Sequence, residues 1–365
     1  MDRNEVYQWR ESVGERLGLG HWQAEMLAVL SLGIAAGRSC TLSTVAEQLG
    51  CLGKADSVER RIQRWLNNKR IHSEKVQKAW VRWVMEAVGW SAERIWLLVD
   101  ETKLGEHLSI MMVGLAYRQR CIGLTWCCYQ PDAWPEGQVA LIERLLKRVK
   151  AVLPDAVEVL VEADRGLATS PDLVEAVLKL DWHCLFRVQG TTHFYNESVA
   201  DTELRGLIQR GAPDWQASGY VFKKADWLPM HVCLIWDAPF DEPWCLISDL
   251  EDINGREYAK RNWQEQGFRD LKSGGWHWNT SQVWQPEHAE RLLLALVLAY
   301  ALILSLGLRC TADAVLQRNV SRGKRQRWSL FRLGLRVLSD LQRRAEPRLF
   351  FLCLSQPVLE FLPSG

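Results

Sequence analysis

The chain has 365 residues, of which 48% are hydrophobic and 24% are charged, so it can form one large domain or two to three smaller ones. This is the composition of an ordinary globular protein, and it excludes a fibrous or low-complexity chain. The 10 cysteines include no CxxC pair, which excludes a zinc-finger spacing. Together with an N-terminus that lacks a signal-peptide pattern, they predict reduced thiols in a cytoplasmic protein.

The net charge of +1 is unevenly distributed along the chain. Acidic side chains are in excess over residues 91–308, whereas residues 309–348 carry 11 Lys and Arg against 3 Asp and Glu. A basic tail beside an acidic centre suits a protein that holds a polyanion and gathers metal-binding carboxylates. A solvated helical tail has the same composition, and charge alone does not separate the two interpretations.

Residues 1–90 are predicted to form a separate all-helical domain. The segment TLSTVAEQLG begins with candidate N-cap residues at Thr41 and ends at Gly50. The next segment, from Ser57, has apolar residues at helical spacing surrounded by basic ones: Val58, Ile62 and Trp65, with Arg60, Arg61, Arg64, Lys69 and Arg70. Two short helices, the second of them basic, resemble a helix-turn-helix DNA module, although a packed helical bundle has the same pattern.

From Arg94 the pattern changes to alternating strands and helices. RIWLLVDETKL is an apolar strand that is predicted to end on Asp100, and AVEVLVEADRG is another that ends on Asp164. The elements predicted around them are a hairpin at 108–129, helices at 137–154 and 170–180, and a strand at 182–190. This order predicts a mixed α/β layer architecture for residues 91–190.

Residues 191–250 alternate in short strand-like pieces with many tryptophans and are predicted to form a β-rich insertion. The α/β core resumes over residues 251–308, and a basic helical region follows over 309–365. The uncharged run at 292–308 is at the lower edge of membrane-spanning length. Because it follows a polar helix in an otherwise globular chain, a buried core helix is favoured over a membrane span, and no membrane partner is expected.

The segment REYAKRNWQEQGFRDLKSGGWHW, which begins at Arg256, is predicted to be an amphipathic helix. Asn254 and Glu257 have the spacing of a capping box, which places the start of the helix near them. Ser273 and the two glycines after it are predicted to stop the helix.

Four polar residues of this segment share one face of the predicted helix. They lie within about 60° of one another: Tyr258, Arg261, Glu265 and Lys272. Such a stripe is either a surface salt-bridge ladder or one wall of an active site. Arg261 and Glu265 alone fit a ladder, because they are four residues apart and opposite in charge, whereas Tyr258 and Lys272 do not fit it.

Asp100 and Asp164 are predicted at the carboxyl ends of two strands, where side chains can point together into a crevice. Glu265 supplies a third carboxylate from a helix. Converging carboxylates repel one another unless a cation binds between them, and Mg²⁺ or Mn²⁺ prefers such oxygen ligands. Two ions of this kind can activate a water and stabilise the leaving oxygen in phosphoryl transfer. Cap or turn chemistry at strand ends, and the paired carboxylates of glycoside hydrolysis, are the alternatives.

Three sequence blocks resemble the IS4-type DDE transposases. The four residues of the stripe have every spacing of the Y-(2)-R-(3)-E-(6)-K signature of that family. VDET around Asp100 resembles the first catalytic aspartate block, and EADRGLATSPDLVEAVLKLDWHCLFRVQG around Asp164 resembles the second. The blocks stand in the expected order and cover most of residues 94–300.

The resemblance implies an RNase H-like catalytic core interrupted by the β-rich insertion. Its catalytic triad would be Asp100, Asp164 and Glu265, which would hold two Mg²⁺ or Mn²⁺ ions. Phosphate contacts are implied for the signature segment: Tyr258, Arg261, Arg269 and Lys272. A tryptophan would stack on a flipped base, and the candidates are Trp215, Trp227, Trp236 and Trp244 in the insertion and Trp276 and Trp278 after it.

The resemblance therefore predicts a bacterial DNA transposase, associated with the nucleoid when it is bound to DNA. It would bind double-stranded terminal inverted repeats as a homodimer, through residues 1–90 with Arg60, Arg61 and Arg64 and through the basic C-terminal region. It would cleave the transposon ends, with or without a hairpin, and join the 3′-OH ends to target DNA. Two alternatives are a transposase-derived DNA-binding protein without this activity and an RNase H-like nuclease that does not transfer strands.

Overall fold

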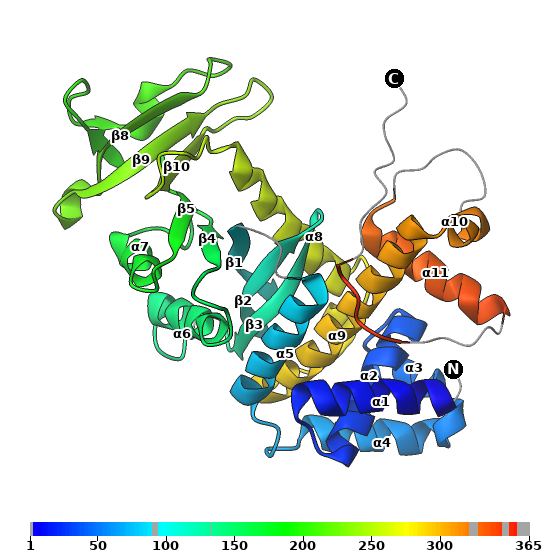
Figure 1. The fold of residues 1–365 in the computed structure, drawn as a ribbon. Helices are drawn as coiled ribbons and strands as arrows, with labels where there is room; N and C mark the ends of the chain where they lie inside the picture. The colour runs from blue at the N-terminus through cyan, green and yellow to red at the C-terminus, as the bar shows by residue number, and fades with distance from the viewer. Residues whose placement is uncertain (1–2, 90–93, 132, 321–327, 345–349, 356–365) are drawn as a thin grey trace.

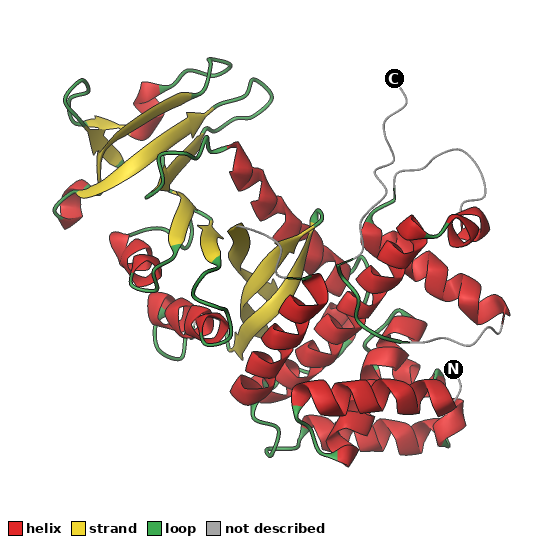
Figure 2. Ribbon diagram, viewed as in Figure 1, coloured by secondary structure: helices red, strands yellow, loops and turns green. Residues whose placement is uncertain are grey.

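The computed structural model describes residues 3–89, 94–131, 133–320, 328–344 and 350–355. A large sheet is joined to a helical body, so the mixed α/β class predicted from the sequence is confirmed (Figure 1, Figure 2). The α-helices are α1 Arg3–Leu17, α2 His21–Gly37, α3 Leu42–Glu47, α4 Ala55–Leu66, α5 Ser73–Val88, α6 Gln138–Lys150, α7 Pro171–Leu178, α8 Arg261–Leu271, α9 Pro286–Ala312, α10 Ala314–Val320 and α11 Leu330–Arg344. The strands are β1 Arg94–Leu104, β2 Leu108–Tyr117, β3 Arg120–Tyr129, β4 Glu158–Ala163, β5 His183–Arg187, β6 His193–Tyr195, β7 Thr202–Glu203, β8 Trp215–Val221, β9 Leu228–Ile235 and β10 Trp244–Ser248.

The first five helices confirm that residues 3–89 are helical. α2 is apolar on almost every side, and its residues 24–35 are all buried. In α4 the residues at helical spacing, Val58, Ile62 and Trp65, are buried as predicted, so its basic side chains are left toward the surface. These helices share one hydrophobic core with the sheet.

The strands of the described residues form one ten-stranded sheet in the order β3-β2-β1-β4-β5-β10-β9-β8-β6-β7. The strands β1, β2 and β3 are antiparallel neighbours, whereas β4 and β5 run parallel to β1. The predicted β-rich segment contains β6 to β10, and its last strand pairs with β5, so it continues the same sheet. In Figure 1 this continuation projects away from the helical body.

The predicted end of the first strand at Asp100 is wrong, because β1 continues to Leu104. Antiparallel pairing of β1 with β2 extends to Leu104↔Leu108, where the hairpin turn begins. On its other side, however, the parallel pairing of β1 with β4 stops at Val99↔Ala163. Asp100 therefore lies inside a strand, but at the point where its parallel neighbour ends.

The outer edge of β3 is covered by side chains from two helices. Gln77 of α5 donates to the carbonyl oxygen of Trp126 at 3.0 Å and accepts from its N–H at 3.3 Å. Trp80 donates to the carbonyl oxygen of Gly123, and Glu290 of α9 accepts from the N–H of Cys128. An uncovered edge strand can pair with another chain, so these side chains both close the sheet and attach the helical body to it.

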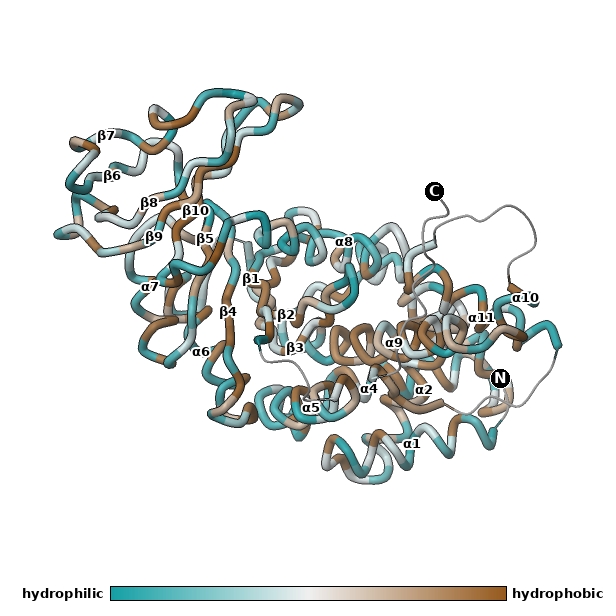
Figure 3. The backbone as a smooth tube through the Cα atoms, turned by 45° about the horizontal axis from the view of Figure 1, so that its top comes forward, coloured by the Kyte–Doolittle hydropathy of each residue, from teal (hydrophilic) through white to brown (hydrophobic). Residues whose placement is uncertain are grey.

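The apolar run at 292–308 forms most of α9, the long helix in the centre of the helical body (Figure 3). Among the described residues this helix alone is long and apolar enough to cross a membrane, and its apolar window is entirely buried inside the protein. The prediction that this run is a buried core helix is therefore confirmed.

The predicted continuous helix from Asn254 to Ser273 is divided in two. A 3₁₀ turn covers Arg256–Lys260, and α8 follows over Arg261–Leu271. The capping box is also wrong, because the residue at the start of the 3₁₀ turn is Gly255. The side-chain oxygen of Asn254 accepts from the N–H of Arg256 at 2.9 Å. The predicted stop is confirmed, since α8 ends just before Ser273.

The basic C-terminal region is helical where it is described, as α10 and α11, whereas residues 321–327, 345–349 and 356–365 lie outside the described residues. α11 packs on α9 through a close backbone approach. A Cβ atom added at Gly334 would lie 1.9 Å from the carbonyl oxygen of Ile303. Because Gly334 has no side chain, the backbones of α11 and α9 can pack in direct contact.

Gly334→Ala is expected to lower the thermal unfolding temperature, because the added methyl group must push α11 away from α9 at a cost of about 1–3 kcal/mol or more. Gly50→Ala is the matched control, since its Cβ would meet nothing within 4 Å. Differential scanning calorimetry measures both variants. Equal unfolding temperatures for the two would contradict the close packing of these helices.

Candidate active site

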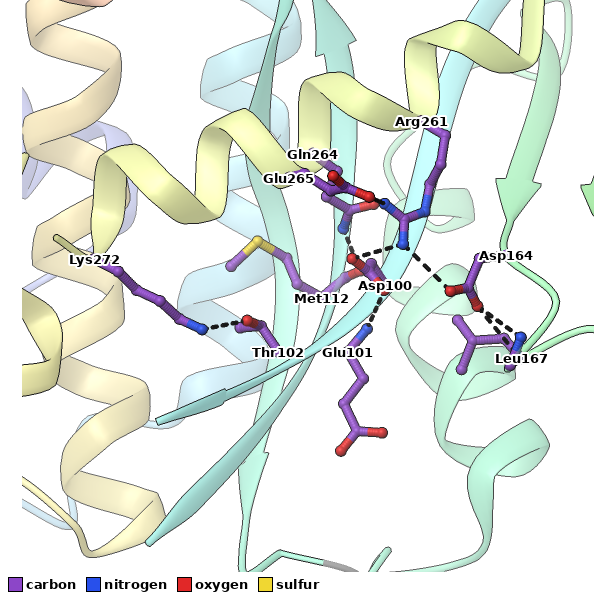
Figure 4. Close-up of polar contacts among 11 residues, drawn as sticks. Asp100, Glu101, Thr102, Met112, Asp164, Leu167, Arg261, Gln264, Glu265 and Lys272 are labelled. Atoms are coloured by element: carbon purple, nitrogen blue, oxygen red, sulfur yellow. Dashed lines mark hydrogen bonds and ion pairs between the residues drawn. The ribbon is translucent and has the colours of Figure 1, made fainter. Parts of the chain in front are cut away.

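The guanidinium of Arg261 lies between the three carboxylates that were predicted to form a catalytic group (Figure 4). Its Nη2 is 3.1 Å from Asp100 Oδ2 and 3.4 Å from Asp164 Oδ2. Its Nη1 is 3.0 Å from Glu265 Oε1. The structure therefore brings Asp100 of β1, Asp164 after β4 and Glu265 of α8 together around one cation.

Each aspartate uses one carboxylate oxygen for the backbone and turns the other toward Arg261. Asp100 Oδ1 accepts a hydrogen bond from the N–H of Glu101 at 2.9 Å. Asp164 Oδ1 accepts from the N–H groups of Gly166 and Leu167 at 3.0 and 3.2 Å, in the turn that follows β4. These hydrogen bonds hold both carboxylates in fixed orientations.

The group is closed on one side and open on the other. The side chain of Asp100 is 11% exposed and that of Asp164 is 35% exposed, whereas that of Glu265 is 60% exposed. Asp100 thus forms the floor of the site against the sheet, and a large ligand would approach from the side of Glu265.

Burial governs the electrostatics of the site. It raises the pKa of Asp100 to about 7, and the carboxylates of Asp164 and Glu265 act in the same direction, whereas Arg261 opposes them. Burial by itself would lower the pKa of Arg261, but the surrounding groups, above all Asp100, raise it. Arg261 therefore stays charged, and its charge favours ionised carboxylates around it.

Tyr258 and Lys272 form no hydrogen bond or ion pair with the three carboxylates in this conformation, so their place in one wall of the site stays a prediction. Tyr258 is buried before α8 and packs edge-on against Trp244, with ring centroids 5.3 Å apart. Lys272 follows the last residue of α8, and its Nζ donates to Thr102 Oγ1 at 2.5 Å and to the carbonyl oxygen of Lys103 at 2.7 Å. Tyr258 lies in the 3₁₀ turn before α8, whose rotation per residue differs from that of an α-helix. Lys272 is still in register with α8, but its side chain is held by the hydrogen bonds to β1.

The other basic residues predicted to contact DNA lie apart from the carboxylate group. Arg269 is exposed on α8, and Arg60 and Arg64 are exposed on α4. Arg61 is partly buried, since its Nη2 is 2.6 Å from the carboxylate of Glu25 in α2. Arg61 thus joins two helices in this conformation.

The tryptophans predicted to stack on a base fall into two classes. Those of the β-rich segment, Trp215, Trp227, Trp236 and Trp244, are half-buried and keep some accessible surface. Trp276 and Trp278 are fully buried, and Trp276 packs against Phe331 of α11. The two latter residues have no surface on which a base could stack, because they fill the core between α8 and the helical body.

Sequence reasoning missed Glu162, a fully buried residue of β4 two positions before Asp164. Neither of its carboxylate oxygens has a hydrogen-bond partner among the described residues. Burial raises its pKa well above the usual value, although the charges of Lys260 and Arg261 act in the opposite direction. The signal was an acid inside the apolar run EVLVEA, where an unpaired carboxylate is costly.

Compared with protein-family models and with curated proteins, the chain matches none. The assignment of a function therefore rests on the residues of the site and on their arrangement.

Glu162→Gln tests the protonation of this buried carboxyl group. The pKa of Glu162 is raised in the folded state, so wild-type stability is highest at low pH and decreases as pH rises above the unfolded value of about 4.3. Gln does not ionise, and the variant should gain stability relative to wild type between about pH 5 and pH 8. Urea unfolding midpoints across this range measure the difference. Glu251→Gln, at an exposed position, is the control, and parallel curves for wild type and Glu162→Gln would contradict the assignment.

Proposed function

We propose that this protein is a metal-dependent DNA phosphoryl-transfer enzyme of the DDE transposase class. The convergence of Asp100, Asp164 and Glu265 on one cation is the observation that carries the proposal. These are the three residues that the IS4-type resemblance implies as a triad, and they come from distant parts of the chain. A ladder of surface ion pairs would not gather a buried strand residue, a turn residue and a helix residue at one point.

The donor set fits hard divalent ions. All three side chains offer carboxylate oxygens, which Mg²⁺ and Mn²⁺ prefer, and the guanidinium of Arg261 already acts there as a stand-in cation. Asp100, Asp164 and Glu265 would hold two such ions. When bound, the ions would supply an activated water or 3′-hydroxyl and charge stabilisation for the leaving oxygen.

The order of the first five strands supports an RNase H-like core. An antiparallel β1–β2–β3 meander lies beside the parallel strands β4 and β5, which is the strand arrangement of that fold. The first two acids lie on adjacent parallel strands and the third on the helix α8, which returns over β1 after the insertion. This arrangement is what the resemblance implies for a DDE enzyme.

Basic and aromatic side chains of the chain would position the DNA. Arg261 can form a two-pronged hydrogen bond to a phosphate, and Arg269 extends the positive charge along α8. On α4, Arg60 and Arg64 are available for phosphates of a flanking duplex. Trp236 and Trp244 are the candidates for stacking on a base, since they retain accessible surface.

The full activity would be that of a transposase. The protein would bind double-stranded terminal inverted repeats as a homodimer, cut the transposon ends and join the 3′-OH ends to target DNA. It would act in the bacterial cytoplasm, at the nucleoid. Tyr258 and Lys272 would reach the cleaved end only after a rearrangement, because both are held by protein contacts in this conformation.

Asp100→Ala, Asp164→Ala and Glu265→Ala are each expected to reduce Mg²⁺-dependent nicking of DNA by about a thousandfold or more, because each removes an oxygen ligand of the ions. Binding of the same DNA should change little. Nicking is measured on a supercoiled plasmid that carries the inverted repeats flanking the reading frame, and binding is measured by gel shift.

Asp172→Ala is the matched control, because this acid lies on α7 close in sequence to Asp164 but outside the carboxylate group. It should nick DNA at the wild-type rate. Wild-type nicking by any of the three triad variants would overturn the assignment of that residue. A joining assay with precut ends separates a transposase from a nuclease that only hydrolyses.

A further inference from the structure

We propose that Arg261 is an internal counter-ion that occupies the acidic site until divalent ions displace it, with a DNA phosphate as its next partner. Metal binding and DNA binding would then favour each other. This inference rests on the proposed function, since it concerns the same three carboxylates, but it assigns to Arg261 a role that phosphate recognition alone does not include.

The oxygens that hold Arg261 are the ones that would hold metal ions. Asp100 and Asp164 each point one oxygen to the guanidinium, and their other oxygens are bound by backbone N–H groups. Arg261 and divalent ions are therefore alternative occupants of one position.

The side chain of Arg261 keeps one hydrogen-bond donor unused in this conformation, within the described part of the chain, as do those of Arg120, Arg148 and Arg291. Its Nε is buried and has no hydrogen-bond partner among the described residues. An unsatisfied buried donor is a cost that a move toward another acceptor would remove. The Arg261 side chain is 10% exposed, but its partner Glu265 is 60% exposed, so the solvent-facing side of the group lies next to the guanidinium.

A DNA phosphate is the acceptor that fits this guanidinium. Phosphate oxygens match the two-pronged geometry of an arginine and carry the negative charge that its carboxylate partners now provide. Once Arg261 leaves, three carboxylates face one another without a cation, which raises their affinity for Mg²⁺ or Mn²⁺. Thermodynamic linkage makes the effect reciprocal, so that bound metal also frees Arg261 for DNA.

Mn²⁺ binding to the DNA-free protein tests the competition. Arg261→Gln should bind Mn²⁺ at least about tenfold more tightly than wild type, because a unit positive charge is removed from the ligands. Arg269→Gln removes a charge from the same helix without touching the carboxylates and should bind Mn²⁺ like wild type. Free Mn²⁺ is followed by electron paramagnetic resonance during a titration. Equal or weaker binding by Arg261→Gln would overturn the proposal.

A second measurement uses the wild-type protein and does not depend on the folding of a variant. Arg261 should react slowly with phenylglyoxal in the absence of metal and faster at saturating Mg²⁺, as judged by mass spectrometry of its peptide. The modification rate of Arg269, which is exposed on the same helix, is the control for any general effect of Mg²⁺ on the reagent. Unchanged or slower modification of Arg261 with Mg²⁺ would contradict its displacement.

The two experiments also separate this inference from the proposed function. If wild type and Arg261→Gln bind Mn²⁺ equally, and Asp100→Asn abolishes that binding, the metal site stands and the counter-ion role is wrong. If neither protein binds Mn²⁺ at any concentration that leaves it folded, the metal site and the counter-ion role both fail.

Discussion

The parallel register of β1 on β4 is the constraint on which the site depends. Pairing stops at Val99↔Ala163, so the next residues, Asp100 and Asp164, emerge side by side where one strand continues and the other ends. A shift of one residue would turn one of these carboxylates to the opposite face of the sheet. The register is secured by apolar residues of β1 and β4 that are buried on both faces of the sheet. On one face they belong to the main core, as Val99 and Val161 do, whereas Leu160 on the other face belongs to a smaller apolar cluster. The position of the acidic group thus follows from the packing of the sheet.

The positive charge of Arg261 links the third carboxylate, that of Glu265, to the two aspartates. Asp100 is buried, and without a nearby cation its ionisation would be unfavourable. Arg261 supplies that cation from the first turn of α8, and its contact with Glu265 one turn later brings the third acid to the same point. Gln264, buried between them in sequence, donates to the carbonyl oxygen of Met112 and anchors α8 to the sheet. The position of α8 on the sheet is therefore set both by the Gln264 hydrogen bond and by the ion pairs of Arg261.

The rest of the fold places this group between two bodies of different character. On one side, β6–β10 extend the sheet and carry half-buried tryptophans. On the other, the helical body is attached through α9 and through side chains that cover the edge of β3. The proposed substrate is a long polyanion, and such a ligand would contact both bodies at once while its backbone lies at the carboxylates. A fold that separates aromatic and basic surfaces in this way is suited to the proposed reaction on DNA.

The sequence by itself determined most of the secondary structure, because apolar periodicity governs it over β1–β5 and over α2, α4, α7 and α9. It also identified the three acids that meet, since the sequence blocks that carry the resemblance are local, although the predicted strand end at Asp100 was wrong. Only the tertiary structure decided the contacts of the other two stripe residues. Tyr258 packs in the core from the 3₁₀ turn before α8, and Lys272 donates to Thr102 and Lys103 of β1. Spacing assumes α-helical rotation throughout, and the 3₁₀ turn over Arg256–Lys260 departs from it. The burial of Trp276 was likewise decided by a neighbour distant in sequence, Phe331 of α11, which no local pattern records.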